Sequence, residues 1–126
     1  MNYRLKISKR VSDKLKELQA PTNLTPNILA RLAVGLSLTD PTFPEVLTDK
    51  EAGGLEINRH TLTGEYDFIY KCLITQHAGR EVSDNEYFPT LFNAHLERGI
   101  NLLDSEYKHA GNNEKFTMNL LKYGKE

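Results

Sequence analysis

The chain of 126 residues has few of the residue types on which several common functions depend. Cys72 is its only cysteine, which excludes an internal disulfide and an iron–sulfur cluster held by four thiolates and fits a reducing cytoplasm. The longest apolar stretch, residues 28–38, is interrupted by Arg31, Gly35 and Ser37 and is too short to span a bilayer. The opening residues MNYRLK lack the apolar run of a secretory signal, so we expect a cytoplasmic protein.

Motifs that carry chemistry are also scarce. No glycine-rich phosphate loop followed by lysine is present, which argues against nucleotide hydrolysis. The four histidines, at positions 60, 77, 95 and 109, are scattered, and the spacing of Cys72 and His77 suits a shared metal poorly. We therefore expect no catalytic residue, no metal and no cofactor. Cys72 is expected to be a small core residue, because a sulfur relay would need an accessible, reactive thiolate.

Charge is spread unevenly along the sequence. The apolar fraction of 39% and the charged fraction of 26% are typical of a globular protein, and the length predicts a single domain, 1–126. Residues 1–20 carry a charge of +4 and the remaining residues −5, which gives the net −1. A basic end on an acidic chain favours a surface that faces a polyanion. The alternative is a solvated helix face rich in lysine.

The first 38 residues predict a strand and two helices. Residues 3–8 alternate between apolar and polar side chains, so we expect a half-buried strand with Tyr3 inward and Arg4, Lys6 and Ser8 outward. Ser8 also suits the cap of a first helix that ends before Pro21. The apolar stripe of that helix consists of Val11, Leu15 and Leu18. Thr25 and Pro26 mark the start of a second helix, largely buried, that runs to about residue 38.

The remaining sequence predicts further helices. Prolines and glycines make residues 39–61 a loop with at most short ordered pieces. A third helix is expected from Thr63 to Gly79 and a fourth from Ser83 or Pro89 to Gly111, with Gly99 as a weak spot. A short terminal helix follows from residue 116 to residue 123. The stripes expected in the core are Tyr66, Ile69, Tyr70, Leu73 and His77 in the third helix and Phe92, Leu96, Leu103 and Tyr107 in the fourth. We predict a mainly α fold, with a ribbon-helix-helix-like part (1–38) and a helical extension (62–126).

An isolated strand raises the question of what pairs with it. The simplest partner is the same strand of a second copy, which gives the two-stranded ribbon of a ribbon-helix-helix dimer. Such a ribbon fits the DNA major groove, and the amides at the start of the second helix could hold a phosphate. The candidate DNA-binding residues are Arg4, Lys6, Lys9, Arg10, Lys14, Lys16, Thr25 and Asn27. The alternative is that the cations only keep an edge strand soluble, and the loop 19–24 differs from the tighter turn of typical ribbon-helix-helix repressors.

Two stretches carry a family resemblance. YRLKISKRVSDKLKELQAPTNLTPNILARLAVGLSL and GGLEINRHTLTGEYDFIYKCLI closely resemble the DndE family of DNA sulfur modification proteins, and the resemblance covers nearly the whole chain. It implies a bacterial system that replaces a non-bridging phosphate oxygen of DNA with sulfur supplied by a cysteine desulfurase. It further implies partners that include an iron–sulfur protein and an ATPase-like protein. The subunit itself would be helical, oligomeric and DNA-binding, with nicked duplex as a preferred form, and no catalytic residue is carried over.

Three functions stay open from the sequence. The favoured one is a DNA-binding accessory subunit that contacts mainly the backbone of double-stranded DNA and forms a homodimer or tetramer. The second is a ribbon-helix-helix transcription regulator that reads bases with Arg4 and Lys6. The third is a scaffold that binds only the other modification proteins. The polar segment 56–61 is either a contact loop, in which Arg59 and His60 meet phosphate or a partner, or part of an oligomer interface.

Overall fold

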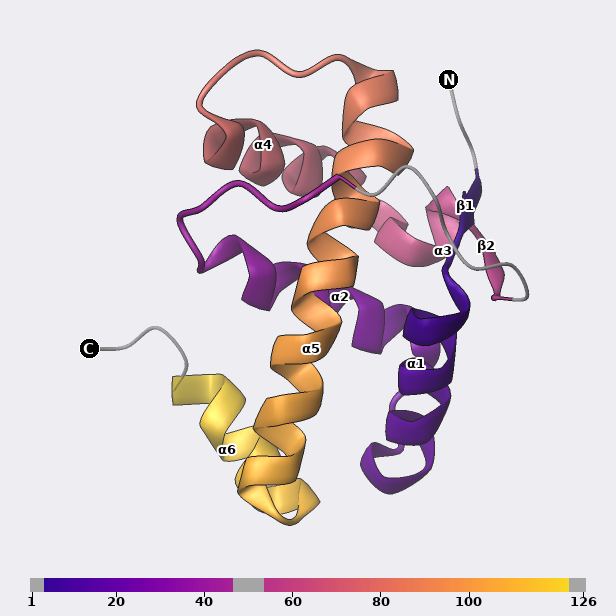
Figure 1. Ribbon diagram of the computed structural model, residues 1–126, viewed down its shortest axis with the longest axis vertical. Helices are drawn as coiled ribbons and strands as arrows, with labels where there is room; N and C mark the ends of the chain where they lie inside the picture. Colours follow the sequence, from indigo (N-terminus) through magenta and orange to yellow (C-terminus); the bar gives the residue numbers. More distant parts are fainter. Residues whose placement is uncertain (1–3, 47–53, 123–126) are drawn as a thin grey trace.

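The computed structural model describes residues 4–46 and 54–122, and Figure 1 shows that helices make up most of it. In chain order the elements are β1 (Arg4–Lys6), α1 (Lys9–Thr22), α2 (Pro26–Leu38), β2 (Glu56–Asn58), α3 (Arg59–Thr63), a 3₁₀ turn η1 (Gly64–Tyr66), α4 (Asp67–Ala78), a π-helical turn η2 (Glu86–Leu91), α5 (Phe92–Ala110) and α6 (Asn113–Lys122). The predicted mainly α fold is confirmed, with a strand and two helices ahead of a further helical part. The predictions for Tyr3 and Tyr123 lie outside the described residues.

Helix α5 runs through the middle of the molecule and packs closely on α2 (Figure 1). At their closest approach, a Cβ atom added to Gly99 would lie 1.8 Å from the carbonyl oxygen of Ala33. Because glycine has no Cβ, the two helix backbones can touch at this point. Gly99 is therefore a packing position, although helix propensity alone marks it as a weak spot.

The first helix forms much as the sequence indicates. Ser8 caps α1 by accepting a hydrogen bond from the amide of Val11 at 3.3 Å, as predicted. The predicted stripe of Val11, Leu15 and Leu18 is buried. The prediction that the helix ends before Pro21 is wrong, since α1 continues to Thr22. Proline in the last turn removes one amide donor without ending the helix, and Asn23, at φ 59°, closes it in the left-handed region.

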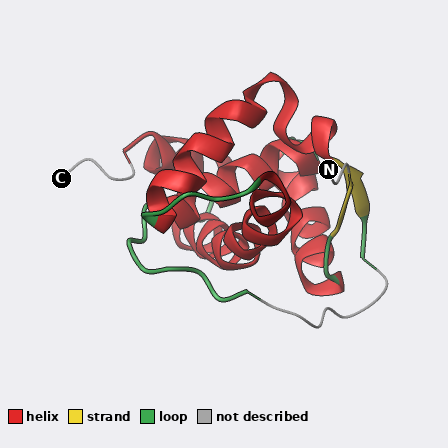
Figure 2. Cartoon of the chain, turned by 90° about the horizontal axis from the view of Figure 1, so that it is seen from above, coloured by secondary structure: helices red, strands yellow, loops and turns green. Residues whose placement is uncertain are grey.

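The strand β1 finds its partner within the chain. It pairs antiparallel with β2, so that Leu5 lies opposite Ile57 and Lys6 opposite Glu56 (Figure 2). The premise that this strand is isolated is therefore wrong, because the sequence interpretation treated residues 39–61 as loop with at most short ordered pieces and missed β2. Leu5 is buried and Arg4 and Lys6 are exposed, as predicted, but Ser8 is buried instead of outward-facing.

Three of the five residues in the predicted stripe of the third helix lie outside the core, whereas Tyr70 packs against the core and His77 is half-buried. Tyr66, Ile69 and Leu73 are 42–52% exposed, and within the described residues of α4 only Ile74 is buried. Cys72 is exposed as well, so the prediction of a core cysteine is also wrong. Helical periodicity identifies an apolar face, but it does not show whether the same chain covers that face.

The last two helices form as expected, although α6 begins at Asn113 and not at residue 116. Phe92, Leu96 and Leu103 are buried and Tyr107 packs against the core, as predicted for the stripe of α5. Helical residues also occur at 84–85, and Phe88, at φ −131° and ψ 124°, separates them from α5 by a kink. In the described ranges, no helix has both the length and the apolar character needed to cross a bilayer.

Candidate nucleic-acid interface

The eight residues predicted to face DNA follow one another along a continuous part of the fold. Arg4 and Lys6 lie in β1, the next four cations (Lys9, Arg10, Lys14 and Lys16) lie in α1, and Thr25 and Asn27 lie at the start of α2. The 14 residues of α1 give it a length of about 21 Å. The structure therefore brings six cations together along β1 and α1, while the start of α2 lies at the far end of α1.

Five of the six cations are exposed, and four of them (Arg4, Lys6, Lys9 and Lys16) lie outside the contacts that join α1 to α5. The guanidinium of Arg4 lies 3.9 Å from the carboxylate of Glu56, and the ammonium group of Lys9 lies 3.0 Å from that of Asp13. Exposed pairs of this kind contribute about 0 to 1 kcal/mol, so they can exchange their carboxylate for a phosphate at little cost. Lys6 and Lys16 are exposed too, on β1 and α1 respectively.

Arg10 is exposed as well, but its guanidinium is held against α5. Its Nη1 donates to Oδ1 of Asn101 at 2.7 Å, and its Nη2 donates to the carbonyl and to Oε1 of Glu97, both at 3.1 Å. The Glu97 side chain is buried and accepts a further hydrogen bond from the hydroxyl of Ser8 at 2.6 Å. Because removal of Arg10 would leave a buried carboxylate with one donor fewer, Arg10 has a structural role.

Lys14 makes the second connection between α1 and α5. Its ammonium group donates to Oδ2 of Asp104 at 2.9 Å, and Lys108 pairs with the same oxygen at 3.0 Å. The hydrogen bond that Lys14 donates to Asp104, followed by the negative charge of Asp104, raises the pKa of Lys14. Burial acts to raise the pKa of Asp104, but hydrogen bonds from Lys14 and Lys108 outweigh it and the pKa is lowered. The charged forms of this pair are therefore favoured.

The start of α2 offers backbone amides. Thr25 is the N-cap residue and Pro26 occupies the first turn, as predicted. The Thr25 hydroxyl donates to the side-chain oxygen of Asn27 and caps no amide of the helix. Since the first amides of a helix point outward and carry partial positive charge, this end of α2 is suited to an anion.

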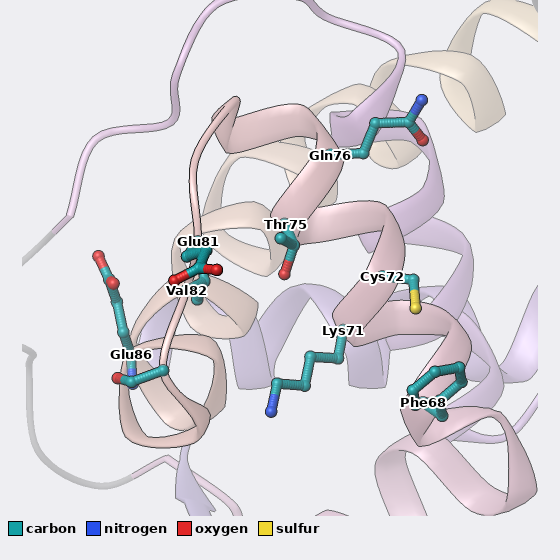
Figure 3. A pocket seen from close by; sticks show the side chains of 9 residues that line it. Phe68, Lys71, Cys72, Thr75, Gln76, Glu81, Val82 and Glu86 are labelled. Carbon is teal, nitrogen blue, oxygen red and sulfur yellow. The ribbon is translucent and has the colours of Figure 1, made fainter.

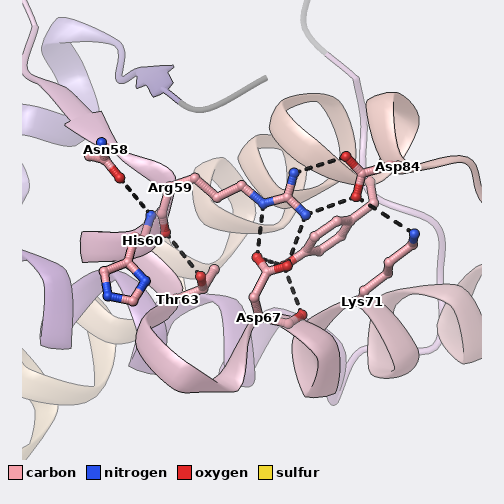
Figure 4. Close-up of polar contacts among 8 residues, drawn as sticks. Asn58, Arg59, His60, Thr63, Asp67, Lys71 and Asp84 are labelled. Atoms are coloured by element: carbon pink, nitrogen blue, oxygen red, sulfur yellow. Dashed lines mark hydrogen bonds and ion pairs between the residues drawn. The ribbon is translucent and has the colours of Figure 1, made fainter. Parts of the chain in front are cut away.

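Arg59, a candidate contact residue in the sequence, is withdrawn from the surface (Figure 4). Its guanidinium donates to both carboxylate oxygens of Asp67, at 3.0 and 2.8 Å, and to both of Asp84, at 3.0 and 2.8 Å. Its side chain is only 9% exposed. The interpretation in which Arg59 meets phosphate is therefore wrong, whereas His60 beside it is exposed.

The surroundings of Arg59 stabilise its charge. The rings of Tyr87 and Phe88 each lie 5.1 Å from its guanidinium carbon, a distance at which cation–π attraction acts. Hydrogen bonds to Asp84 and then to Asp67 raise the pKa of Arg59, and the hydrogen bond from Arg59 lowers the pKa of Asp84 to about 2. The cluster joins α3, α4 and the turn before α5, which makes it a structural clamp.

Two histidines form a buried contact between α4 and α5. The rings of His77 and His95 meet edge to face with centroids 4.8 Å apart. Nδ1 of His95 lies 2.8 Å from the hydroxyl of Ser37, and Nε2 of His77 lies 2.6 Å from the carbonyl oxygen of Asp40. Burial, followed by the charges of His77 and Arg98, lowers the pKa of His95 to about 4. Both histidines are hydrogen-bonded packing residues, His95 buried and His77 half-buried.

The sequence interpretation missed the two acids that hold α1. Glu97 and Asp104 are seven residues apart on α5, two helical turns, and they face Arg10 and Lys14, which are four apart on α1. Acidic residues at a buried face of a predicted helix are a signal that could have been followed. Across residues 4–46 and 54–122, no group of three His, Cys, Asp or Glu side chains is arranged to hold a metal ion.

Comparison with known proteins gives consistent similarities. A family model described as "DndE: DNA sulphur modification protein DndE" matches residues 4–122. A crystal structure of DndE from Escherichia coli B7A, involved in DNA phosphorothioation modification, is 27% identical with a TM-score of 0.64, covering 79% of this chain and 96% of that one. A crystal structure of a DndE mutant involved in DNA phosphorothioation is also 27% identical, with a TM-score of 0.63 and coverages of 83% and 99%. No curated protein sequence matches the chain.

Proposed function

The chain belongs to the DndE family of DNA sulphur modification proteins, and on that premise we propose that it is a non-catalytic subunit that binds duplex DNA for phosphorothioate modification. In this proposal it acts in the cytoplasm beside the other proteins of the same system, and it self-associates as a dimer or tetramer. The observation that carries the proposal is the row of exposed cations on β1 and α1 at the basic end of an acidic chain. The residues that carry it are Arg4, Lys6, Lys9 and Lys16, since the exposed Arg10 is engaged with α5.

The exposed cations suit the DNA backbone better than the bases. Long flexible side chains on one strand and one helix can follow successive phosphates, and the counterions that they displace drive the binding. Such contacts position a protein on the duplex but carry no direct sequence information. This suits a subunit whose partners choose the site of modification. The intrachain pairing of β1 with β2 gives no support to base reading by a ribbon shared between two copies.

The start of α2 supplies a second contact in this proposal. The amides near Thr25 and Asn27 would accept a phosphate at the far end of α1. With α1 about 21 Å long, the β1 cations and this helix end would grip phosphates well apart along the duplex, and α1 would lie over the backbone between them.

Arg10 and Lys14 have a different role from the other four cations. Both are engaged with buried acids of α5, Glu97 and Asp104, so they hold α1 in place. We predict that Arg10→Ala or Lys14→Ala lowers the melting temperature and leaves the salt dependence of DNA binding nearly unchanged. A reduced salt dependence with an unchanged melting temperature would place these two side chains on phosphate instead.

Binding of labelled duplexes tests the proposal. Intact, nicked and unrelated duplexes of one length are titrated with the wild-type chain and with a four-site variant in which Arg4, Lys6, Lys9 and Lys16 are alanine. A matched control carries Lys115→Ala and Lys122→Ala, two exposed lysines of α6. The four-site variant is expected to bind every duplex more weakly by a similar factor, and the control to bind as wild type.

Other results would contradict the proposal in distinguishable ways. Equal affinity of wild type and four-site variant would mean that the DNA surface lies elsewhere. Affinity orders of magnitude higher for one sequence would indicate a transcription regulator. Absence of DNA binding at low salt would indicate that the chain is a scaffold that binds only other proteins. A single species of monomer mass in sedimentation, at every concentration, would contradict the self-association.

A further inference from the structure

The outer surface of α4 is apolar and uncovered within the described chain. Phe68 is 75% exposed, Ile69 and Leu73 lie beside it on the same side of the helix, and Cys72 is also exposed. We call these four residues the α4 face. The largest apolar patches of a monomer are commonly binding sites, because exposed apolar area of this kind favours burial against a partner.

A groove runs beside the α4 face (Figure 3). It has a volume of about 900 Å³ and separates α4 from residues 81–86. Phe68 and Cys72 stand at its edge, Thr75 lies on the helix wall and Val82 lines the opposite side. Because Arg59 and Lys71 both pair with Asp84, the far wall is fixed to α4 and the groove is preformed.

The charges at the two ends of the α4 face indicate which kind of partner could bind there. Lys71 is engaged with Asp84, and Arg80 is engaged with Glu86 through a two-pronged ion pair. In the described ranges, by contrast, no ion pair is formed by Glu65, which precedes the face, or by Glu81, which follows it. The apolar surface therefore has an uncompensated carboxylate at each end.

We propose that the α4 face and its groove bind an amphipathic helix of another protein, with an apolar stripe flanked by lysine or arginine at both ends. The proposal rests on the proposed function only in that a multi-protein modification system supplies the partner. A helix laid in a groove buries its apolar stripe there, and its terminal cations meet Glu65 and Glu81. A second copy fits less well, because a two-fold axis through α4 would bring Glu65 of one chain towards Glu81 of the other.

The surface is separate from the proposed DNA contacts, which lie on β1, α1 and the start of α2. Figure 1 places α4 on the opposite side of α5 from α1 and the two strands. Partner binding and DNA binding can therefore be lost independently.

The test uses synthetic peptides as defined probes. One peptide of about 18 residues, long enough to form a helix, carries leucines at helical spacing and lysines at both ends, and a second carries glutamates in place of the lysines. The lysine peptide is expected to bind the full chain, and Phe68→Glu is expected to weaken it about tenfold or more. Leu121→Glu on α6, where Leu121 is 70% exposed, is the matched control and is expected to bind as wild type.

Two further measurements complete the test. Glu65→Lys combined with Glu81→Lys is expected to reverse the preference, so that the glutamate peptide binds better. The lysine peptide is also expected to slow alkylation of Cys72, the single thiol of the chain, while Phe68→Glu leaves duplex binding at the wild-type level.

The proposal is overturned by any of three results. Equal affinity for both peptides would mean that Glu65 and Glu81 do not select the partner. Unchanged affinity of Phe68→Glu for the lysine peptide would mean that the peptide does not bind at the α4 face. Protection of Cys72 that grows with protein concentration in the absence of peptide would show that a second copy covers the face. Unchanged duplex binding in the four-site variant, with peptide binding intact, would contradict the proposed function and leave this proposal standing, so the two failures are distinguishable.

Discussion

The buried histidine of α5 leads to a sharp prediction about acid stability. His95 is 1% exposed, and its Nδ1 lies 2.8 Å from the hydroxyl of Ser37, which also accepts a hydrogen bond from Nε of Arg98 at 2.8 Å. The ring of His77 lies against it. A proton added to His95 would thus place a positive charge in a buried site beside Arg98, which the folded chain resists.

The loss of folding stability in acid follows from the difference between the pKa of His95 in the folded chain and in the unfolded chain. The pKa of His95 is about 4 in the folded chain against an ordinary value of 6.5, so the unfolded chain takes up the proton first as the pH falls. The contribution to stability is complete above about pH 6.5 and is lost as the pH falls towards 4. The loss is about 1.4 kcal/mol per pH unit and about 3 kcal/mol in total.

Urea denaturation at a series of pH values measures this loss. The perturbation is His95→Asn, which keeps a short acceptor near Ser37 and removes the titrating ring. The variant is expected to be less stable at pH 7, because the smaller side chain leaves a cavity. The difference in free energy of unfolding between wild type and variant should shrink by about 2 kcal/mol as the pH falls from 6.5 to 5. Stability curves that stay parallel over this interval would refute the reasoning.

Two other substitutions test the packing and the clamp. Gly99→Ala places a methyl group where Ala33 leaves no room, so we expect a loss of about 2 kcal/mol in urea denaturation despite the better helix propensity of alanine. An increase in stability would contradict the close contact of α2 and α5. Arg59→Met leaves Asp67 without its arginine counterion and Asp84 with only the more distant Lys71, and we expect a loss of about 2 kcal/mol at pH 7. Arg59 lowers the pKa of both carboxyls, so the difference in free energy of unfolding between wild type and variant should shrink below about pH 4. A difference that stays constant down to pH 2 would argue against the clamp.

Local signals in the sequence predicted the first part of the fold. Ser8, the stripe of α1 and the Thr25–Pro26 helix start act over only a few residues, so their consequences are visible in the sequence alone. The strand β2 was missed because its stability comes from pairing with β1, far away in the chain, and three residues carry no clear alternation of their own.

The errors in the candidate site have the same origin. Arg59 looks like an exposed contact residue until the fold brings Asp67 and Asp84 to its guanidinium. The cations of α1 look equivalent until the buried acids of α5 engage Arg10 and Lys14. In both cases the decisive partner is remote in sequence, and charge patterning cannot reveal it.

The α4 face shows a different kind of error. The sequence placed Ile69 and Leu73 in an apolar stripe but not Phe68, and Ile69 and Leu73 face outward while Ile74 packs inward. An apolar stripe can be buried by the same chain or by a partner, and periodicity is the same in both cases.

The central claim is that exposed cations on β1 and α1 bind the DNA backbone. The most direct measurement is the slope of the logarithm of the binding constant against the logarithm of salt concentration, on two duplexes of unrelated sequence. With four cations on phosphate the slope should be steeper by about 3 to 4 in the wild type than in the four-site variant, and equal for both duplexes. Identical slopes for wild type and variant would contradict the account.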